Sequence, residues 1–384
     1  MKVAILGAGT QAHAILDDFL RFEGAEAVGV ADADPAQVER LVAWGGDERV
    51  TGTTLDVSDR QAVTRWLEPF DAAISAVPYR FNLELARAAV DAGTHLTDLG
   101  GNNDIVDATL ALDPAARAAG VRLLPDLGLA PGMVGLLGAD LVRGLEGERE
   151  LHLRVGGLPQ APAWPMNYRL FFSVSGLVNE YIEPCRVLRG GEPQVVPGLS
   201  ELEELEFPEP YGRLEAFQTS GGTSTLIESL RGEVRELTYK TIRYPGHCAE
   251  VRLLQDLGLF SSEPTRVGGT EVVPRDLTEQ LMLDALGEPT PDVILLRITA
   301  RGERDGRRVE VVEEMVELAD AERGLSGMAR MTGYPAAIIT AMIARGEVVG
   351  AGAEPQEACV PADRFRAALA ERGLRIERTE RVLP

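Results

Sequence analysis

A short glycine-rich turn near the start of the chain is the first segment whose residue types and spacing indicate a particular chemistry. Gly7-Ala8-Gly9-Thr10-Gln11-Ala12 follows an apolar run typical of a buried strand and precedes a helical pattern over 11–22. Gly7 allows the tight turn, Gly9 lets the backbone approach a pyrophosphate, and Ala12 keeps helix and strand close. Because the helix start then presents free N–H groups to the phosphates, the segment predicts a dinucleotide site that includes Thr10 and Gln11.

The ends of the next predicted strands indicate which dinucleotide is bound. Asp32 lies twenty residues beyond Ala12, where a carboxylate accepts hydrogen bonds from the adenosine ribose and repels a 2′-phosphate. NAD is therefore favoured over NADP, and Asp34 is a substitute for Asp32 if the strand ends two residues later. Asp56 follows the third strand, where we expect the adenine. Ala76-Val77-Pro78 follows the fourth strand, beside the expected nicotinamide ribose, although both segments are equally compatible with plain loops.

The first third of the chain supplies the elements that position these residues. Short apolar runs alternate with amphipathic stretches, which is typical of βαβ units on a parallel sheet. The predicted strands are 3–6, 25–31, 50–55, 72–76, 95–98 and 122–125, and the predicted helices are 11–22, 35–43, 58–67 and 83–92. The expected fold class is α/β, with an N-terminal Rossmann domain, a doubly wound parallel sheet, over residues 1–128.

The pattern changes after the hinge 128–132. A helix is expected over 133–142, and strands over 151–155, 168–172, 237–243, 293–300 and 309–319, with the last two forming an antiparallel hairpin. Residues 129–326 are therefore predicted to form a second α+β domain with a mixed or antiparallel sheet, which binds substrate and forms a dimer contact. Residues 327–384 are expected to contribute a helix, 328–344, and a tail that pack back on the Rossmann domain.

The composition of the chain argues against several kinds of binding partner. The formal net charge of −22 argues against nucleic-acid binding. No apolar run approaches the ~20 residues that a bilayer span needs. The three cysteines lack a CxxC pair, which argues against a disulfide framework and a structural zinc site, so no metal is expected. With no room for a signal peptide before the first predicted strand, we expect a cytoplasmic protein.

Several longer strings resemble the saccharopine dehydrogenase-like family, and most closely its bacterial L-lysine 6-dehydrogenases. The matching strings are PDLGLAPGM (125–133), VGGLP (155–159), EAFQTSGGTSTL (215–226), YKTIRYPGH (239–247) and MAR (328–330). The resemblance implies NAD-dependent oxidative deamination of the ε-amine of L-lysine. The products are ammonia and the 6-semialdehyde, which cyclises to piperideine-6-carboxylate. It also implies a homodimer.

One departure from the saccharopine reductases bears on the substrate. Their hinge typically carries an aspartate before Pro-Gly, whereas this chain has Ala130, so the resemblance favours free lysine over saccharopine. A saccharopine or carboxynorspermidine dehydrogenase is the alternative within the family. An alternative of another class is a non-catalytic NAD-binding sensor or scaffold, which would lack a convergent polar site at the nicotinamide.

Lysine oxidation needs a group that takes a proton from the ε-ammonium and groups that hold the amino-acid end. Asp98 and Asp126 end the fifth and sixth predicted strands and are candidates for the ammonium, or are helix caps. Arg243 is the first candidate for the α-carboxylate because a guanidinium binds it bidentately. Tyr168 matches a family tyrosine and is a candidate for orienting the amine.

The remaining candidates have ordinary structural alternatives. His247 lies in a Tyr-Pro-Gly-His turn and is either a base or a structural histidine. Lys240, one of two lysines in the chain, is either a base of low pKa or a solvent-facing strand residue. The hydroxyls of Thr219, Ser220 and Thr223 either bind the amino-acid end of the substrate or stabilise a tight turn.

Overall fold

The N-terminal half of the molecule is built on a seven-stranded parallel sheet. The computed structural model describes all 384 residues. The strand order is β17-β6-β5-β4-β1-β2-β3, and neighbouring strands pair in parallel throughout. The bounds are β1 Lys2–Leu6, β2 Ala27–Asp32, β3 Val50–Thr54, β4 Ala72–Ser75, β5 His95–Asp98, β6 Arg122–Leu124 and β17 Gly352–Ala353. The order reverses direction between β1 and β4, which is where open α/β sheets bind their ligands.

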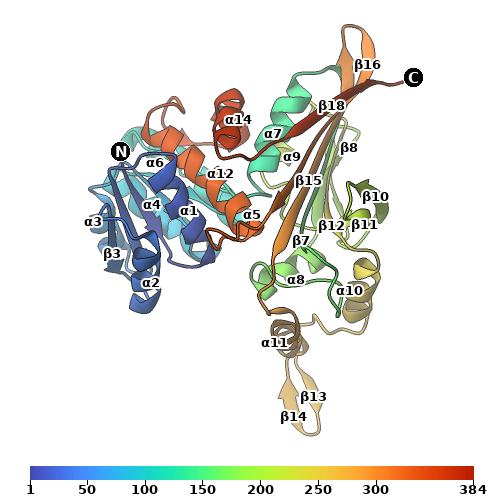
Figure 1. The fold of residues 1–384 in the computed structure, drawn as a ribbon, viewed down its shortest axis with the longest axis horizontal. Helices are drawn as coiled ribbons and strands as arrows, with labels where there is room; N and C mark the ends of the chain where they lie inside the picture. The colour runs from blue at the N-terminus through green and yellow to red at the C-terminus, as the bar shows by residue number, and fades with distance from the viewer.

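Helices cover both faces of this sheet, as its continuous apolar strands require. One face packs against α1 (Thr10–Arg21), α2 (Pro35–Gly45) and the late helix α12 (Gly327–Ala344). The other face packs against α3 (Arg60–Leu67), α4 (Asn82–Ala92) and α6 (Asp113–Ala119). A 3₁₀ turn, η1 (Tyr79–Phe81), and α5 (Asn103–Leu110) follow β4 and β5. Figure 1 shows the first third of the chain in blue and cyan, with α12 in orange-red beside α1.

The second half is organised by a nine-stranded mixed sheet. Its main order is β10-β11-β12-β7-β15-β16-β18, and β8 pairs with β12 and β9. β7 runs parallel to β12 and antiparallel to β15, which makes the sheet mixed. The bounds are β7 Glu146–Pro159, β8 Cys185–Arg189, β9 Glu192–Val196, β10 Glu203–Phe207, β11 Gly212–Gln218, β12 Glu236–Arg243, β15 Asp292–Arg304, β16 Arg307–Leu318 and β18 Glu377–Val382.

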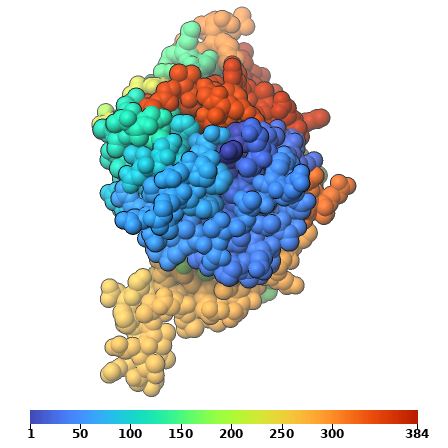
Figure 2. All heavy atoms as spheres, turned by 90° about the vertical axis from the view of Figure 1, so that its left-hand side faces the viewer, coloured from blue at the N-terminus to red at the C-terminus, as the bar shows by residue number.

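Short helices surround this sheet. α7 (Met133–Arg143) packs on β7 and β15, and α8 (Val174–Ile182), α9 (Leu226–Ser229), α10 (His247–Asp256) and α11 (Pro274–Leu286) follow along the chain. The hairpin of β13 (Thr265–Val267) and β14 (Thr270–Val272) extends from α11. In Figures 1 and 2 this hairpin projects away from the rest of the molecule.

The last sixty residues contact both sheets. α12 packs along α1 so closely that a Cβ at Gly333 would lie 2.7 Å from the Ala14 Cβ. β17 extends the parallel sheet beyond β6, and α13 (Gln356–Cys359) and α14 (Ala362–Glu371) follow. β18 then crosses to the other half and pairs with β16 (Figure 1). Of the segment expected to pack back on the Rossmann domain, α12 lies against α1, whereas β18 lies on the mixed sheet.

The predicted fold class is confirmed, and so is the antiparallel hairpin of β15 and β16. The strand expected over 168–172 is wrong: this segment is a loop. Its aromatic side chains pack with α8, and the Leu170 N–H donates to Leu286 O at 2.9 Å, at the end of α11. Division of the chain at residues 128 and 326 stays a prediction, since one cluster of 58 buried residues runs through both halves.

None of the helices combines the length and the apolar character that a bilayer crossing requires.

Candidate active site

The glycine turn has the geometry that a dinucleotide requires. Gly7 adopts φ +102°, and a Cβ there would lie 2.8 Å from Ala76 O, so only glycine fits between β1 and β4. A Cβ at Gly9 would meet nothing within 4 Å. That open space lies at the start of α1, where no side chain caps the free N–H groups. The residues present therefore fit a bound pyrophosphate.

The acid at the end of β2 is held beside this turn. Asp32 Oδ2 accepts the Ala8 N–H at 2.8 Å, and Oδ1 accepts the Asp34 N–H at 2.9 Å. Asp34 itself caps α2 by accepting the Ala36 N–H at 2.9 Å, so Asp32 rather than Asp34 faces the turn. Asp56 accepts the Ser58 N–H at 2.9 Å in its own loop, and its place at the adenine stays a prediction.

The segment after β4 borders the same edge. The Ala76 N–H donates to Leu6 O at 2.7 Å, and Val77 Cγ1 would lie 3.0 Å from a Cβ at Gly7. The turn η1 follows Pro78, and its Tyr79 ring lies over Gly101 in the loop after β5. The segments after β1, β4 and β5 therefore meet at the point where the strand order reverses.

Two buried carboxylates lie at this edge, after β5 and β6. Asp98 Oδ1 accepts the Gly100 N–H at 2.7 Å and the Asp126 N–H at 3.2 Å, so Asp98 supports the loop that carries Asp126. Asp126 adopts φ +65°, unusual for a residue with a Cβ, and its Oδ1 is buried without a partner. Burial raises the pKa of Asp98 to about 6. Burial, with the neighbouring Asp98, raises the pKa of Asp126 to about 7.

Ser224 connects this carboxylate to the other half of the molecule. The Ser224 hydroxyl donates to Asp126 Oδ2, and the Gln356 side chain donates to Asp126 O at 3.0 Å. The sequence predicted Thr219, Ser220 and Thr223 in the same loop but missed Ser224. Which hydroxyl of this loop faces the acid depends on the positive φ of 37° at Ser224, a conformation that no residue pattern indicates.

The second polar group surrounds Arg243 at the end of β12. Its guanidinium is 2% exposed, stacks 4.7 Å from the centre of the Tyr168 ring, and donates from Nη1 to Ile242 O at 3.0 Å. Arg243 Nε and the Tyr168 hydroxyl are both buried without a hydrogen-bond partner. The nearest carboxylate oxygen, Glu180 Oε2, lies 4.0 Å from Nη2. A buried, underpaired guanidinium is a binding site for an anion, because leaving it unpaired is costly.

Glu180 was not predicted from the sequence. It lies on α8, a helix the sequence analysis did not predict, and its side chain is 31% exposed. Burial nevertheless raises the pKa of Glu180 to about 7, although Arg243 opposes the rise.

The two polar groups lie along one face of β12. Alternation along the strand places Tyr239, Thr241 and Arg243 on the same face. A Cβ at Gly222, two residues before Ser224, would lie 2.4 Å from the Tyr239 ring. The loop that carries Ser224 therefore lies at the Tyr239 end of this face, and Arg243 lies at its other end.

The structure does not bring Lys240 to this site. Lys240 lies three residues before Arg243 and therefore on the opposite face of β12. Its ammonium donates to Glu201 O at 2.6 Å and to Glu203 Oε2 at 2.8 Å. The expectation that it is a catalytic base is corrected to that of a structural ion pair.

His247 lies next to Arg243 with both ring nitrogens occupied. Nδ1 lies 2.9 Å from Met166 O and must donate, so Nε2 accepts from the Tyr181 hydroxyl at 2.9 Å. Burial, together with the positive charge of Arg243, lowers the pKa of His247 to about 3. His247 is therefore neutral and supports the site instead of acting as its base.

The three predicted hydroxyls are also engaged within the protein. Thr219 Oγ1 lies 2.6 Å from Thr241 Oγ1, Ser220 Oγ donates to Asn179 O at 3.3 Å, and Thr223 Oγ1 donates to Arg186 O at 3.2 Å. These contacts fix the loop that presents Ser224. Their predicted contact with substrate stays a prediction.

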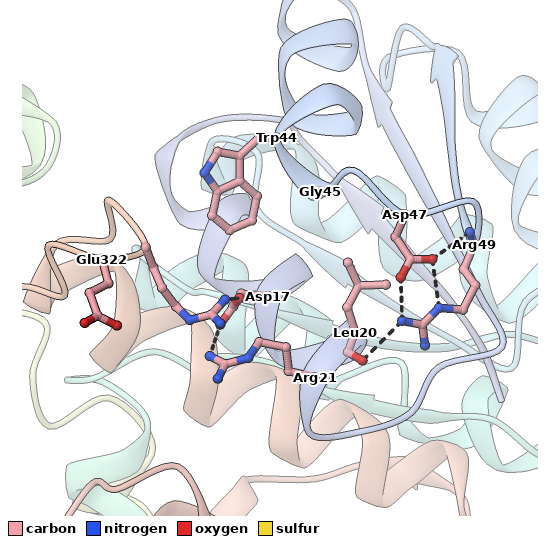
Figure 3. Close-up of a pocket in the computed structure, with 9 residues that line it drawn as sticks. Asp17, Leu20, Arg21, Trp44, Gly45, Asp47, Arg49 and Glu322 are labelled. Carbon is pink, nitrogen blue, oxygen red and sulfur yellow. Dashed lines mark hydrogen bonds and ion pairs between the residues drawn. The ribbon is translucent and has the colours of Figure 1, made fainter.

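A separate hollow of about 510 Å³ lies at the far end of α1 from the glycine turn (Figure 3). Its charged side chains are paired with one another: Arg21 lies 3.4 Å from Asp17, and Arg49 lies 2.6 Å from Asp47. Because its three arginines are already paired with acids and it lies away from the glycine turn, we do not place the active site in this hollow.

Two sheets, a glycine turn at the strand reversal and buried polar groups beside it are typical of a two-domain protein of the pyridine-nucleotide-binding class. Models of two domains match the chain: "Saccharopine dehydrogenase NADP binding domain" over residues 3–124 and "Saccharopine dehydrogenase C-terminal domain" over residues 128–374. The chain belongs to the saccharopine dehydrogenase family of oxidoreductases.

Individual relatives are distant. The NADP(+), L-glutamate-forming saccharopine dehydrogenase of Saccharomyces cerevisiae is 23% identical, over 91% of this chain and 92% of its own. An alpha-aminoadipic semialdehyde synthase of Arabidopsis thaliana is 22% identical over 59% of this chain but only 22% of its own length.

Two solved structures share the fold. The apo saccharopine dehydrogenase (L-Glu forming) of S. cerevisiae has a TM-score of 0.81 at 20% identity and covers 99% of both chains. The homospermidine synthase of Legionella pneumophila, solved in complex with NAD, has a TM-score of 0.70 at 12% identity and covers 98% of this chain and 91% of its own.

Proposed function

We propose that the protein is an NAD-dependent oxidoreductase that oxidises the ε-amine of L-lysine to the 6-semialdehyde and releases ammonia. The observation that carries this proposal is the pair of buried polar groups. Asp126, a buried carboxylate with a free oxygen, lies at the sheet edge where we expect the nicotinamide, and Arg243, an underpaired guanidinium, lies at the end of β12. An amino acid with a terminal amine has the complementary charge at each end.

The choice of NAD follows from the residues at the end of β2. Asp32 is fixed where the adenosine ribose is expected, and the stretch Val30–Gln37 contains two acids and no basic residue. A 2′-phosphate would meet Asp32 without a compensating arginine. This supports NAD, although the matched family model and the S. cerevisiae relative are named for NADP.

Different residues are proposed to contact the two ends of the lysine substrate. When bound, NAD would supply the acceptor for a hydride from the carbon that carries the amine, and water would hydrolyse the resulting substrate imine to the semialdehyde and ammonia. Because a lysine ammonium has a pKa near ~10.4, a base must first take its proton, and we assign this role to the buried carboxylate of Asp126. Ser224 and Asp98 hold Asp126 in position. Arg243 binds the α-carboxylate, and the Tyr168 hydroxyl supplies a further hydrogen bond.

A second candidate is a dehydrogenase for a carboxyalkyl amine such as saccharopine. The similarity to the S. cerevisiae relative favours it. Ala130 argues against it, because the aspartate typical of saccharopine reductases is missing from the hinge.

A panel of amines with NAD and NADP, followed by absorbance of the reduced cofactor, tests the proposal. Turnover of free lysine with NAD is the expected result, and turnover only of amines with a carboxyalkyl group would transfer the assignment to the second candidate. Binding of NAD without turnover of any amine would favour a sensor or scaffold.

D32A should raise the KM for NAD about tenfold, because one or two hydrogen bonds to the ribose are lost. D91N, at an exposed ion pair with Arg60, is the control.

We also propose a homodimer, which light scattering on the eluted protein tests.

A further inference from the structure

The Glu180 carboxylate has acceptor capacity that the protein does not use. No hydrogen bond from the protein reaches its side-chain oxygens, and its nearest cation is Arg243, at 4.0 Å. The backbone around it is well fixed: Ser173 Oγ caps α8 by accepting the Gly176 N–H at 3.3 Å, and the Ser220 N–H donates to Glu180 O at 2.9 Å. Glu180 is therefore a positioned carboxylate with free oxygens.

Glu180 and Arg243 present opposite charges side by side. The ionised carboxylate only accepts hydrogen bonds and the guanidinium only donates them. At 4.0 Å the two groups are close enough to attract but too far apart to satisfy each other. Arg243 Nε is buried and unpartnered, and so is the Tyr168 hydroxyl beneath the guanidinium. Unsatisfied groups of both kinds therefore lie next to one another.

We propose that Glu180 and Arg243 together bind the zwitterionic α-carbon end of an amino acid, with Glu180 accepting from the α-ammonium and Arg243 donating to the α-carboxylate. An α-carbon carries these two charges within a few ångströms of each other, the arrangement that matches the pair. Glu180 is then the residue that makes a free α-amino group a requirement for substrates. This inference rests on the proposed amine oxidation for its place in the reaction.

Three amines separate the two contacts. L-Lysine has both α-groups, 6-aminohexanoate lacks the α-amine, and 1,5-diaminopentane lacks the carboxylate. E180Q should lower kcat/KM for lysine roughly 10- to 100-fold, as expected for a charge-assisted hydrogen bond, and leave 6-aminohexanoate unchanged. R243M should lower kcat/KM for lysine and for 6-aminohexanoate, because both carry the carboxylate. It should leave kcat/KM for 1,5-diaminopentane unchanged. E228Q, at a carboxylate that is 60% exposed on α9, is the control.

A binding measurement separates this inference from the proposed reaction. L-Norleucine and hexanoate lack the reacting amine, so calorimetry with the NAD-loaded protein reports the amino-acid end alone. Norleucine should bind more tightly than hexanoate to the wild type, and E180Q should remove the difference. If E180Q removes this difference in affinity while the protein oxidises no amine, binding of the amino-acid end by Glu180 and Arg243 is supported and the proposed reaction is contradicted.

Two outcomes would contradict the proposed role of Glu180. One is an equal loss of kcat/KM for lysine and for 6-aminohexanoate in a folded E180Q protein. The other is norleucine binding that is the same in E180Q as in wild type. E180D keeps the charge and should retain part of the preference for norleucine, which excludes a folding defect as the cause of the E180Q effect.

Discussion

The Asp126 carboxylate combines three properties that a proton acceptor for an amine needs. It is buried, one of its oxygens has no partner, and its pKa is raised to about 7. Burial is the largest cause, and the charge of Asp98 adds to it, while the Ser224 hydroxyl opposes the rise by donating to the ionised form. A base with a pKa near the working pH is half ionised there and still binds a proton well.

The pH dependence of lysine oxidation should reflect this carboxylate. Since the base must be ionised, kcat/KM should rise with pH through about 7. S224A should move this rise to higher pH because the ionised form loses a hydrogen bond. D126N should lower kcat/KM by roughly 10²- to 10⁴-fold. A D126N enzyme with wild-type rates and the same rise with pH would remove Asp126 from the mechanism.

The same pKa has a consequence for stability. The folded protein holds the Asp126 proton up to about pH 7, whereas the unfolded chain releases it near pH 4. The contribution of this carboxyl to stability is therefore present at low pH and is lost as the pH rises through 4–7. Asp98, with a pKa of about 6, contributes in the same direction. Thermal melts of the apo protein should show a weaker pH dependence in D126N.

The sequence predicts the site residues that belong to a motif of fixed spacing, but not those whose position depends on how a loop packs. Gly7, Gly9 and Asp32 follow from a motif whose spacing is fixed by the ligand, so the sequence predicted them. The opposite faces of Lys240 and Arg243 also follow from the strand period, a signal that the sequence analysis did not use. Glu180 could not be predicted, because its helix follows an aromatic segment that resembles a strand but packs against α11.

The loop after β5 supplies a test of this geometry. Gly100 adopts φ +75°, and a Cβ there would lie 1.8 Å from Asp126 Oδ1. G100A should therefore displace the carboxylate and lower kcat/KM about 10²-fold, the effect of a misplacement near 1 Å. Gly93 is the matched control: it has φ +73° and nothing within 4 Å of its Cβ position. G93A should cost about 1–2 kcal/mol of stability, from the left-handed backbone alone, and leave kcat/KM unchanged. Equal kinetics in the two variants would contradict the model of the site.

The C-terminal segment is joined to the N-terminal half by buried charge as well as by apolar contacts. Arg372, at the end of α14, is 1% exposed and donates to Asp18 and Glu23, which are also buried. R372M should destabilise the protein by about 3–5 kcal/mol because the buried Asp18 carboxylate loses its only cation, whereas Glu23 keeps its ion pair with Arg345. R364M is the control in the same helix, because the Arg364 side chain is 63% exposed and its ion pair is at the surface. This substitution should change the free energy of unfolding by less than about 1 kcal/mol. Thermal unfolding of both variants provides the comparison, and equal melting temperatures would show that Arg372 is not a structural link.

The position of α12 also determines how the nascent protein can fold. On the order of 200 residues separate β6 from α12, which at 5–20 residues per second is roughly 10–40 s of synthesis. Throughout that interval the apolar side of α1 that later receives Gly333 has no covering helix, and the outer edge of β6 has no neighbouring strand. The ribosome thus delivers the nucleotide-binding half first, but that half reaches its final packing only near the end of translation. Chaperones that shield apolar surface therefore have their longest opportunity on the part of the enzyme that is made earliest.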